Sequence, residues 1–357
     1  MIVKDTPLWK VIANDIQLLI KSNSFDYDHP ICTERSICEK YRVSRITAKH
    51  AITTLQQHGI LYRKRGLGSF VVKTITADSP QKTFALVIPF SATEGGTIRI
   101  IETVNLIFAE KKYQMSIYVD QLQATQNLEL LKNFYNSVDG IIYYPLTSAL
   151  PLEILNTFVQ QKKPVIILDK TTAHSEFTHV ICDHYKGGYM LTEHLLSLGH
   201  TKTCYLSRFK PEELASISER YKGYHDCLTA SGIEPYFIHW DAAEREQTES
   251  YNMLQHFITT LRLKGITAII CENDKVAFNV YMCCQDLGIR VPEDISITGF
   301  DNIEWATMGS ASITTIDQNF ELIGEGIAAV LTDQNYKPKN YTIPVKLIHR
   351  TSTGKAK

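Results

Sequence analysis

The sequence predicts two folded domains: a small unit of three helices and a β-hairpin, and a larger α/β unit with two doubly wound parallel sheets. The chain has 357 residues, which is more than one hydrophobic core ordinarily organises. Residues 1–73 show helical periodicity followed by two short strands, whereas residues 83–357 alternate between apolar strands and helices. We call these segments the head and the body, and expect residues 74–82 to link them.

The head begins with an amphipathic helix, because residues 8–20 place an apolar side chain at every third or fourth position after Pro7. Thr33 and Ser44 are suitable N-caps for a second and a third helix. Two alternating strands then flank a basic, glycine-containing segment at 64–68, which predicts a hairpin. The order of helices and hairpin is that of a winged helix-turn-helix.

The third helix and the hairpin carry the side chains that DNA recognition requires. Arginine reads a guanine edge with two hydrogen bonds, hydroxyl groups bond phosphates or bases, and glycine allows the backbone to approach closely. The head has 12 basic and 6 acidic residues on a chain whose net charge is −1, which favours a polyanion as its partner. We expect double-stranded operator DNA to contact Arg35, Ser44, Arg45, Thr47, Lys49, His50, Arg65 and Gly66.

These residues occur in an order that resembles the GntR family of winged helix-turn-helix domains. Residues 33–36 are similar to a conserved turn of that family, 43–48 to the start of its recognition helix, and 66–71 to its wing. The resemblance spans about residues 6–73 and implies DNA contacts for all the residues named above except His50 and Arg65. Cys32 and Lys49 depart from the family pattern, which usually has proline and arginine there, and lysine cannot make the two-pronged contact of an arginine.

The sequence of the body predicts parallel sheets, because short apolar strands alternate with helices. Strands are expected at 84–89, 115–119, 140–144, 165–168, 203–206, 236–239, 268–271 and 295–299. Helices are expected near 98–111, 126–136, 150–161, 185–199, 217–231, 247–264 and 274–287. The strands form two groups, and the tail at 313–348 is able to return to both, so we expect two lobes with a ligand cleft between them.

Ligands of such sheets bind beyond the carboxyl ends of the strands, so the residues that follow the strands are the informative ones. Carboxylates, amides and arginine exchange hydrogen bonds with hydroxyl groups, and an aromatic ring stacks on the apolar face of a sugar. We therefore expect a small sugar effector to contact Phe90, Tyr144, Asp169, Arg220, Asn273 and Asp301. Asp274 is expected to cap its helix, which leaves Asn273 as the ligand candidate beside it.

The body resembles the LacI family and, with it, the periplasmic binding proteins. The motifs that carry this resemblance lie at 183–200, 218–224, 291–302 and 313–318. It covers about residues 83–350 and implies that Arg220, Asn273, Asp301 and Gln318 face the effector, whereas Gly187 and Gly188 pack helices. A GntR-type head on a LacI-type body is similar to the arabinose repressor group. This implies a repressor that releases DNA when a sugar such as arabinose binds.

Other functions are less consistent with the sequence. An enzyme would need a motif for a nucleophile, a metal or a phosphate group. The sequence contains no GxSxG nucleophile motif, no HExxH metal motif and no P-loop. We expect no catalysis, no cofactor and no metal site. A sugar-binding protein without a DNA function would not need the basic head. A regulator that senses a sugar phosphate or a nucleobase is an alternative function, because Lys170 and Arg220 are available to bind an anion.

The remaining expectations concern environment and assembly. The eight cysteines show no CxxC spacing, which indicates a reduced chain. No run of about 18 apolar residues and no signal-peptide pattern occurs, so we expect a cytoplasmic protein without a membrane partner. A homodimer is expected, since one small head reads few base pairs.

Overall fold

The structure is a computed structural model that describes residues 7–21, 29–57, 60–64, 67–71, 82–89, 95–120, 137–145, 150–170, 173–240 and 247–357. It divides into two compact units, Met1–Ser79 and Pro80–Lys357, which contain the head and the body. The expected linker at 74–82 lies almost entirely outside the described residues, so the domain boundaries stay predictions. No helix in the described part of the chain is long and apolar enough to cross a membrane.

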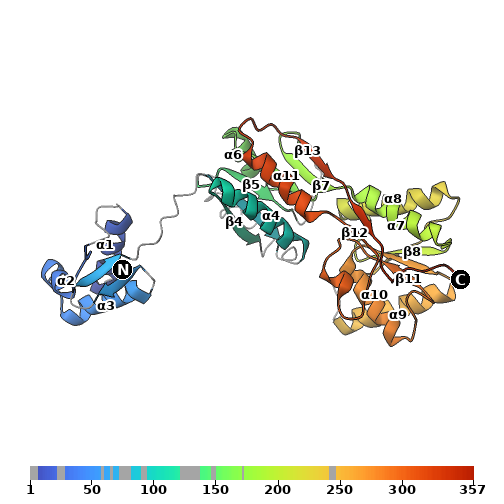
Figure 1. The fold of residues 1–357 in the computed structure, drawn as a ribbon, viewed down its shortest axis with the longest axis horizontal. Coiled ribbons are helices and arrows are strands. Elements are labelled where there is room, and N and C mark those ends of the chain that lie inside the picture. Colours follow the sequence, from blue (N-terminus) through green and yellow to red (C-terminus); the bar gives the residue numbers. More distant parts are fainter. Residues whose placement is uncertain are drawn as a thin grey trace, which may run out of the picture. The chain divides into compact units, whose positions relative to one another are not determined.

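The head has the predicted order of helices and hairpin (Figure 1). Its elements are α1 (Leu8–Lys21), α2 (Glu34–Tyr41), α3 (Arg45–Gln57), β1 (Leu61–Lys64) and β2 (Gly68–Val71). Thr33 caps α2 as expected, since its hydroxyl accepts from the Ser36 N–H at 3.0 Å and the Ser36 hydroxyl accepts from the Thr33 N–H. Arg42, in the left-handed region, ends α2, so that α3 begins after a short turn.

The hairpin packs on the helices through its second strand. β1 and β2 pair antiparallel, and the Ser69 N–H donates to the Cys32 carbonyl at 2.8 Å, so the segment before α2 also joins β2. Gly68 is required here because its φ is +126° and a Cβ atom would lie 2.8 Å from Pro30. Ile12, Ala48, Ile52 and other buried side chains form the small core of the head.

The first lobe of the body is built on a parallel sheet of six described strands, in the order β13-β7-β6-β5-β3-β4. The strands are β3 (Lys82–Pro89), β4 (Tyr113–Asp120), β5 (Gly140–Tyr143), β6 (Val165–Leu168), β7 (Thr178–Cys182) and β13 (Asn340–Ile343). The helices that accompany them are α4 (Gly96–Lys111), α6 (Leu152–Gln160) and α11 (Phe320–Thr332). The strand β7 was not predicted, and the helix expected at 126–136 lies outside the described residues.

Both faces of this sheet are covered, as the continuous apolar strands predicted. Phe84 and Leu86 point to one core with α4 and α11, while Ala85 and Val87 point to a second core with α6. Figure 1 shows α4 and α11 lying side by side, and their contact is close at Gly324, where a Cβ atom would lie 2.7 Å from the Thr103 side chain.

The second lobe has four described parallel strands in the order β11-β10-β8-β9. They are β8 (Thr203–Ser207), β9 (Phe237–His239), β10 (Ala268–Cys271) and β11 (Ser296–Thr298). One face packs on α7 (His184–Ser197) and α8 (Ala215–Ala230), and the other on α9 (Gln247–Leu263) and α10 (Asp274–Asp286). A short 3-10 helix, η2 (Glu304–Thr307), follows β11.

The chain passes between the lobes three times, as the returning tail predicted. The first passage joins β7 to α7, the second joins β12 (Thr315–Asp317) to α11, and the third joins β13 to β14 (Lys346–Ile348). β12 and β14 pair antiparallel. A single bridge joins Thr298 to Thr314, and another joins Asp301 to Asp317. The first lobe is therefore completed by residues from the far end of the chain.

Candidate functional site

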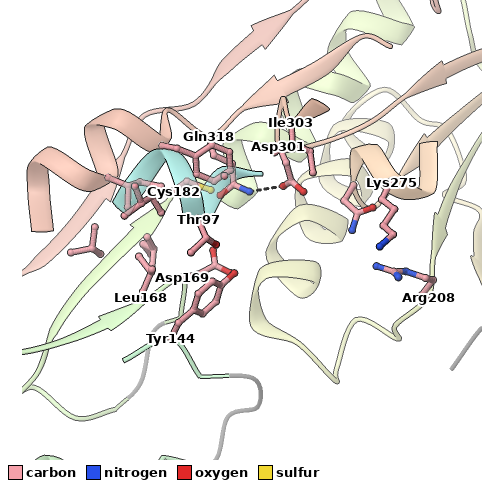
Figure 2. A pocket seen from close by; sticks show the side chains of 17 residues that line it. Thr97, Tyr144, Leu168, Asp169, Cys182, Arg208, Lys275, Asp301, Ile303 and Gln318 are labelled. Atoms are coloured by element: carbon pink, nitrogen blue, oxygen red, sulfur yellow. Dashed lines mark hydrogen bonds between the residues drawn. The ribbon is translucent and has the colours of Figure 1, made fainter. Parts of the chain in front are cut away.

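A cavity of about 300 Å³ lies between the two lobes, at the carboxyl ends of their strands. Tyr144 follows β5, Asp169 follows β6, Arg208 follows β8, and Asp301 lies beyond β11. Figure 2 shows the polar ends of these side chains directed into one space. This is the position that the parallel sheets predicted for a ligand.

On the first-lobe side, Asp169 is held by two partners. Its carboxylate accepts from His184 Nε2 at 2.9 Å and from the Tyr144 hydroxyl at 3.3 Å. Burial raises the pKa of Asp169, but His184 and Arg220 outweigh it and hold that pKa below its ordinary value. The backbone of Asp169 is in the left-handed region, with φ +61°, so the extended conformation of β6 ends at this residue. The site therefore keeps an ionised carboxylate that is ready to accept hydrogen bonds from hydroxyl groups.

Arg220 lies behind the cavity rather than in its wall. The guanidinium is 3.2 Å from the Asp301 carboxylate, donates to the Glu272 carbonyl at 2.6 Å, and lies 3.8 Å above the centre of the Phe300 ring. Only 8% of its side chain is exposed. Arg220 thus fixes Asp301, which lines the cavity itself and also accepts a hydrogen bond from the Gln318 amide (Figure 2).

Asp301 carries both electrostatic and backbone strain. Burial raises the pKa of its carboxyl group, although Arg220 and Gln318 oppose that rise. Its φ of +114° is a conformation that side-chain-bearing residues rarely adopt. Strain of this kind is maintained where the surroundings fix a functional side chain, which agrees with a ligand-binding role.

Cys182, His184 and Asp169 together look like a thiol nucleophile with its base, but the details oppose that chemistry. The Cys182 sulfur is 3.3 Å from His184 Nδ1. Arg220 Nε donates to the same nitrogen at 3.2 Å, so the atom that would take the thiol proton already accepts a hydrogen bond. Burial raises the pKa of Cys182 well above its ordinary value, so its reactive thiolate form is suppressed.

On the second-lobe side, the cavity has a cationic wall that the sequence interpretation missed. Arg208 and Lys275 both line the cavity, and Figure 2 shows them on the side opposite Tyr144 and Asp169. Arg208 Nε donates at 2.7 Å to Glu272, whose side chain is buried and also accepts from the Ser207 hydroxyl. Arg208 follows a strand just as Asp169 does, so the rule that selected Asp169 would have selected it too.

Five of the seven expected effector residues line the cavity: Tyr144, Asp169, Asn273, Asp301 and Gln318. Arg220 lies behind them, and Phe90 lies outside the described residues. The expectation for Asn273 and Asp274 has to be corrected in part, because Asn273 is the N-cap of α10 and accepts from the Val276 N–H at 2.9 Å. Asp274 is fully buried and bonds Thr315 and the Ile303 N–H instead. That these five residues contact an effector stays a prediction.

The head presents a second candidate surface along the start of α3. Arg45 and Lys49 are exposed, and the Ser44 hydroxyl caps the helix by accepting from the Thr47 N–H at 3.2 Å. His50 is exposed but stacks on Trp9, with 4.4 Å between the ring centres. Arg35 is exposed on α2 and pairs with Glu39. Arg65 and Gly66 lie outside the described residues, so the whole expected DNA-contact set stays a prediction.

Glu34 connects three elements of this surface. Its carboxylate accepts from Arg45 Nε on α3 at 2.8 Å and from Arg63 on β1 at 2.9 Å. The hydrogen bond from Arg45 is the main reason why the pKa of Glu34 is lowered. One acidic side chain of α2 therefore orients a basic side chain of the recognition helix and another of the wing. No periodicity in the sequence indicates the contact between Glu34 and Arg63, because these residues are 29 positions apart.

Comparisons with known proteins agree with this division. Residues 8–71 match the family of bacterial regulatory proteins described as the gntR family. Residues 192–353 match the periplasmic binding protein-like domain. The chain joins a gntR-type winged helix to a periplasmic-binding-protein-like body. The resemblance of the head to the GntR family and of the body to the periplasmic binding proteins is thereby confirmed, as is the predicted fold class.

Relatives that resemble this chain are named as repressors. The chain is 28% identical over 347 residues to the arabinose metabolism transcriptional repressor of Halalkalibacterium halodurans. The alignment covers 92% of this chain and 91% of the relative. The repressor of the same name from Geobacillus stearothermophilus is 25% identical and covers 88% and 87% of the two chains. The HTH-type transcriptional repressor PurR of Yersinia pestis is 30% identical over 225 residues, which are 61% of this chain and 64% of that one.

Solved structures confirm the fold of the periplasmic-binding-protein-like body. A LacI family transcriptional regulator from Enterococcus faecium with bound ribose has a TM-score of 0.65 and 24% identity, covering 77% of this chain and all of that one. The complex of the transcriptional regulator CelR with cellobiose has a TM-score of 0.63 and 20% identity, covering 87% and 91%. At these identities the likeness extends to the fold alone.

Proposed function

We propose that this protein is a transcriptional repressor whose gntR-type head binds operator DNA and whose body binds a small sugar that releases the DNA. The observation that carries the proposal is the cavity between the lobes, with carboxylate, amide and aromatic side chains, in a chain that also has a gntR-type head. Relatives that align over most of the chain are named arabinose metabolism repressors, which supports the same function. The proposal places the protein in the cytoplasm, where its operator lies.

The cavity has the chemistry for a monosaccharide. Asp169 and Asp301 accept hydrogen bonds from neighbouring hydroxyl groups, and the Asn273 and Gln318 amides both donate and accept. The apolar part of the wall includes Phe320 and Leu168, which suit the C–H face of a sugar ring. A volume of about 300 Å³ is at the small end of ligand pockets, which favours one sugar ring over an oligosaccharide. The proposal assigns this cavity to binding and to no catalytic step.

A phosphorylated or acidic sugar is the second candidate effector, because of the cationic wall. Arg208 and Lys275 both approach the cavity, and the Nη groups of Arg208 have no hydrogen bond within the described part of the chain. A guanidinium binds phosphate or carboxylate with paired hydrogen bonds. The buried Glu272 compensates the charge of Arg208, so a neutral sugar stays the first candidate.

Lobe closure is the proposed route from the cavity to the head. The effector would bridge Asp169 of the first lobe and Asn273 of the second, and so favour the conformation in which both contact it. Arg99 on α4 already joins the lobes, because it donates to Glu321 at 2.8 Å and to the Asn302 carbonyl at 3.3 Å. We propose that the effector biases this arrangement and that the linker transmits the change to the head.

A homodimer is part of the proposal, and exposed apolar side chains of the first lobe support it. Ile98 and Leu106 on α4 are 48% and 73% exposed, and Ile117 and Val119 on the edge strand β4 are 43% and 41% exposed. Ile117 and Val119 share their strand face with Met115, which packs in the α4 core, so the four side chains lie on one side of the sheet. A second copy is the occupant that would place two heads on two half-sites.

The effector is tested by thermal shift with the full-length chain against pentoses, hexoses and their phosphates. A bound ligand raises the melting temperature in proportion to the logarithm of its concentration above Kd. We expect one neutral sugar to stabilise the wild type and to lose most of that effect in Asp301→Asn. The exposed Glu325→Gln on α11 serves as the charge-matched control. No shift with any sugar, or an equal shift in Asp301→Asn, would contradict the effector assignment.

The DNA function is tested separately by gel shift on the protein's own upstream region. Arg45→Ala and Arg35→Ala should weaken binding and lower its dependence on salt. If both variants bind like the wild type, the assignment of the head surface is wrong. A sugar-induced thermal shift without any specific DNA binding would instead identify a sugar-binding protein with no DNA function.

A further inference from the structure

The proposed DNA-binding surface includes an apolar side chain at the start of α3. Ile46 belongs to the first turn of α3 and is 82% exposed. The inner face of the same helix is formed by Ala48, Ala51, Ile52 and Leu55, all of which are at most 3% exposed. Ile46 therefore adds nothing to the core of the head.

Folding does not explain an isoleucine at this position. A β-branched residue has lower helix propensity than alanine or a long polar residue, and an exposed one leaves apolar surface in water. A residue that is unfavourable for the isolated domain at an otherwise polar helix start points to a partner that covers it.

The surroundings of Ile46 identify the chemistry of that partner. Helical spacing places Lys49 and His50 on the same face as Ile46, and Arg45 is its neighbour with 83% of its side chain exposed. Two cationic side chains next to one aliphatic side chain match an anionic surface with an apolar feature. The major groove of DNA is such a surface, because phosphates line its edges and the thymine C5 methyl group lies on its floor.

We propose that Ile46 contacts the C5 methyl group of one thymine in each operator half-site and thereby sets a base preference there. The proposal rests on the DNA-binding function proposed above. Arg45 supports it, because the hydrogen bond to Glu34 limits the positions of the side chain next to Ile46 while leaving it exposed. Cytosine has no C5 methyl group, so the contact distinguishes a T·A pair from a C·G pair at this step.

The test removes the methyl group from the DNA instead of changing the base. A duplex is first selected from a randomised pool with the full-length chain, and each thymine is then replaced by deoxyuridine, which pairs identically. Dissociation constants are measured for the wild type, Ile46→Ala and Ile46→Val. Leu18→Ala is the matched control, because Leu18 is a 64% exposed aliphatic side chain that belongs to α1 and not to the recognition helix.

We expect one thymine in each half-site at which deoxyuridine weakens wild-type binding about fourfold, the value for losing one buried methyl-sized group. At that position Ile46→Ala should bind thymine and deoxyuridine equally, Ile46→Val should keep part of the difference, and Leu18→Ala should behave like the wild type. Equal melting temperatures of the four proteins would show that folding is intact, as expected for exposed side chains.

Two outcomes would overturn the inference and they are distinguishable. If the selected duplex binds but no thymine is sensitive, or Ile46→Ala keeps the same sensitivity, Ile46 does not read a methyl group and the DNA-binding function stands. If no duplex is enriched above the input pool, the DNA-binding function fails and this inference fails with it.

Discussion

Three aspartates near the cavity differ in what holds them. Asp169 and Asp301 line the cavity. Asp169 pairs with His184, and Asp301 pairs with Arg220. Asp274 has no exposed surface and accepts from the Thr315 hydroxyl and the Ile303 N–H, so it holds the segment after β11 against the start of α10. Burial, and next the charge of Asp301, raise the pKa of Asp274 well above its ordinary value.

The raised pKa of Asp274 predicts how stability depends on pH. Because the folded protein binds this proton more tightly than the unfolded chain, Asp274 contributes most stability below its unfolded pKa of about 3.9 and loses it as pH rises through the folded value. Asp274→Asn is always neutral and lacks this loss. We therefore expect the free energy of unfolding of the wild type to fall relative to Asp274→Asn between pH 4.5 and pH 8, measured by urea denaturation. Parallel pH profiles would contradict the role given to this carboxyl group.

At the residue level, the sequence predicts which side chains lie at the cavity where a strand end fixes their position, but not which role a side chain has where a distant partner decides it. Tyr144, Asp169 and Asp301 were found because the ends of parallel strands meet at one edge. The capping role expected of Asp274 belongs to Asn273 instead, because Asp274 is bound by Thr315, which is 41 positions away. Short-range capping rules carry no information about such a contact.

At the scale of elements, the packing of α7 on α8 depends on glycines. A Cβ atom on Gly188 would collide with the backbone carbonyl of Arg220, and one on Gly223 with the backbone carbonyl of Tyr185. These contacts are backbone to backbone, so no side-chain rotation relieves them. Gly188 and Gly223 thus allow the close approach of α7 and α8, in which Arg220 Nε lies 3.2 Å from His184 Nδ1.

Two glycine substitutions should have opposite effects. Gly188→Ala forces α7 and α8 apart and should lower the free energy of unfolding by about 2–3 kcal/mol, with weaker sugar binding because Arg220 moves. Gly326→Ala, inside α11, is the control: its Cβ atom would lie 3.8 Å from Ile343, an ordinary contact. It should raise the free energy of unfolding by about 0.5–1 kcal/mol. Urea denaturation of the two variants measures both, and a stable Gly188→Ala would contradict the packing argument.

The strand β7 shows why one element escaped the sequence prediction. Its first residues, Thr178 and His179, are polar, so the segment lacks the apolar run of the other strands, yet both side chains are buried. Thr178 bonds the Tyr336 hydroxyl and His179 bonds the Asn340 amide, more than 150 positions along the chain. Local periodicity identifies a strand whose burial is apolar, but not one whose polar side chains are satisfied by the tail.

At the scale of the whole molecule, the proposed dimer gives a test of assembly. Leu106→Glu places a charge on the exposed apolar side of α4 and β4, where a second copy would have to bury it. We expect it to convert a dimer to a monomer in light scattering and to weaken operator binding at least about tenfold, because the two heads lose their linkage. Leu322→Glu on α11, also at an exposed leucine, is the control. A dimeric Leu106→Glu would place the interface elsewhere.

The proposed release of DNA by sugar also has a thermodynamic consequence for the whole chain. If the sugar lowers operator affinity by some factor, the operator must lower sugar affinity by the same factor. Titration of sugar into the free protein and into the protein–operator complex measures one factor, and gel shifts with and without sugar measure the other. Unequal factors would mean that the two ligands do not act on one shared conformational equilibrium.

The three passages of the chain between the lobes also fix an order of events during synthesis. The four parallel strands of the second lobe, β8 to β11, lie in one continuous stretch of chain, so their sheet can form before β14 has emerged to pair with β12. The first lobe starts at β3, but its core includes Phe320, Ile327 and Ile343, and its sheet gains β13 only near the end of the chain. Since distant contacts close late, we expect the six-stranded sheet of the first lobe to begin emerging before the parallel sheet of the second lobe and to be completed after it.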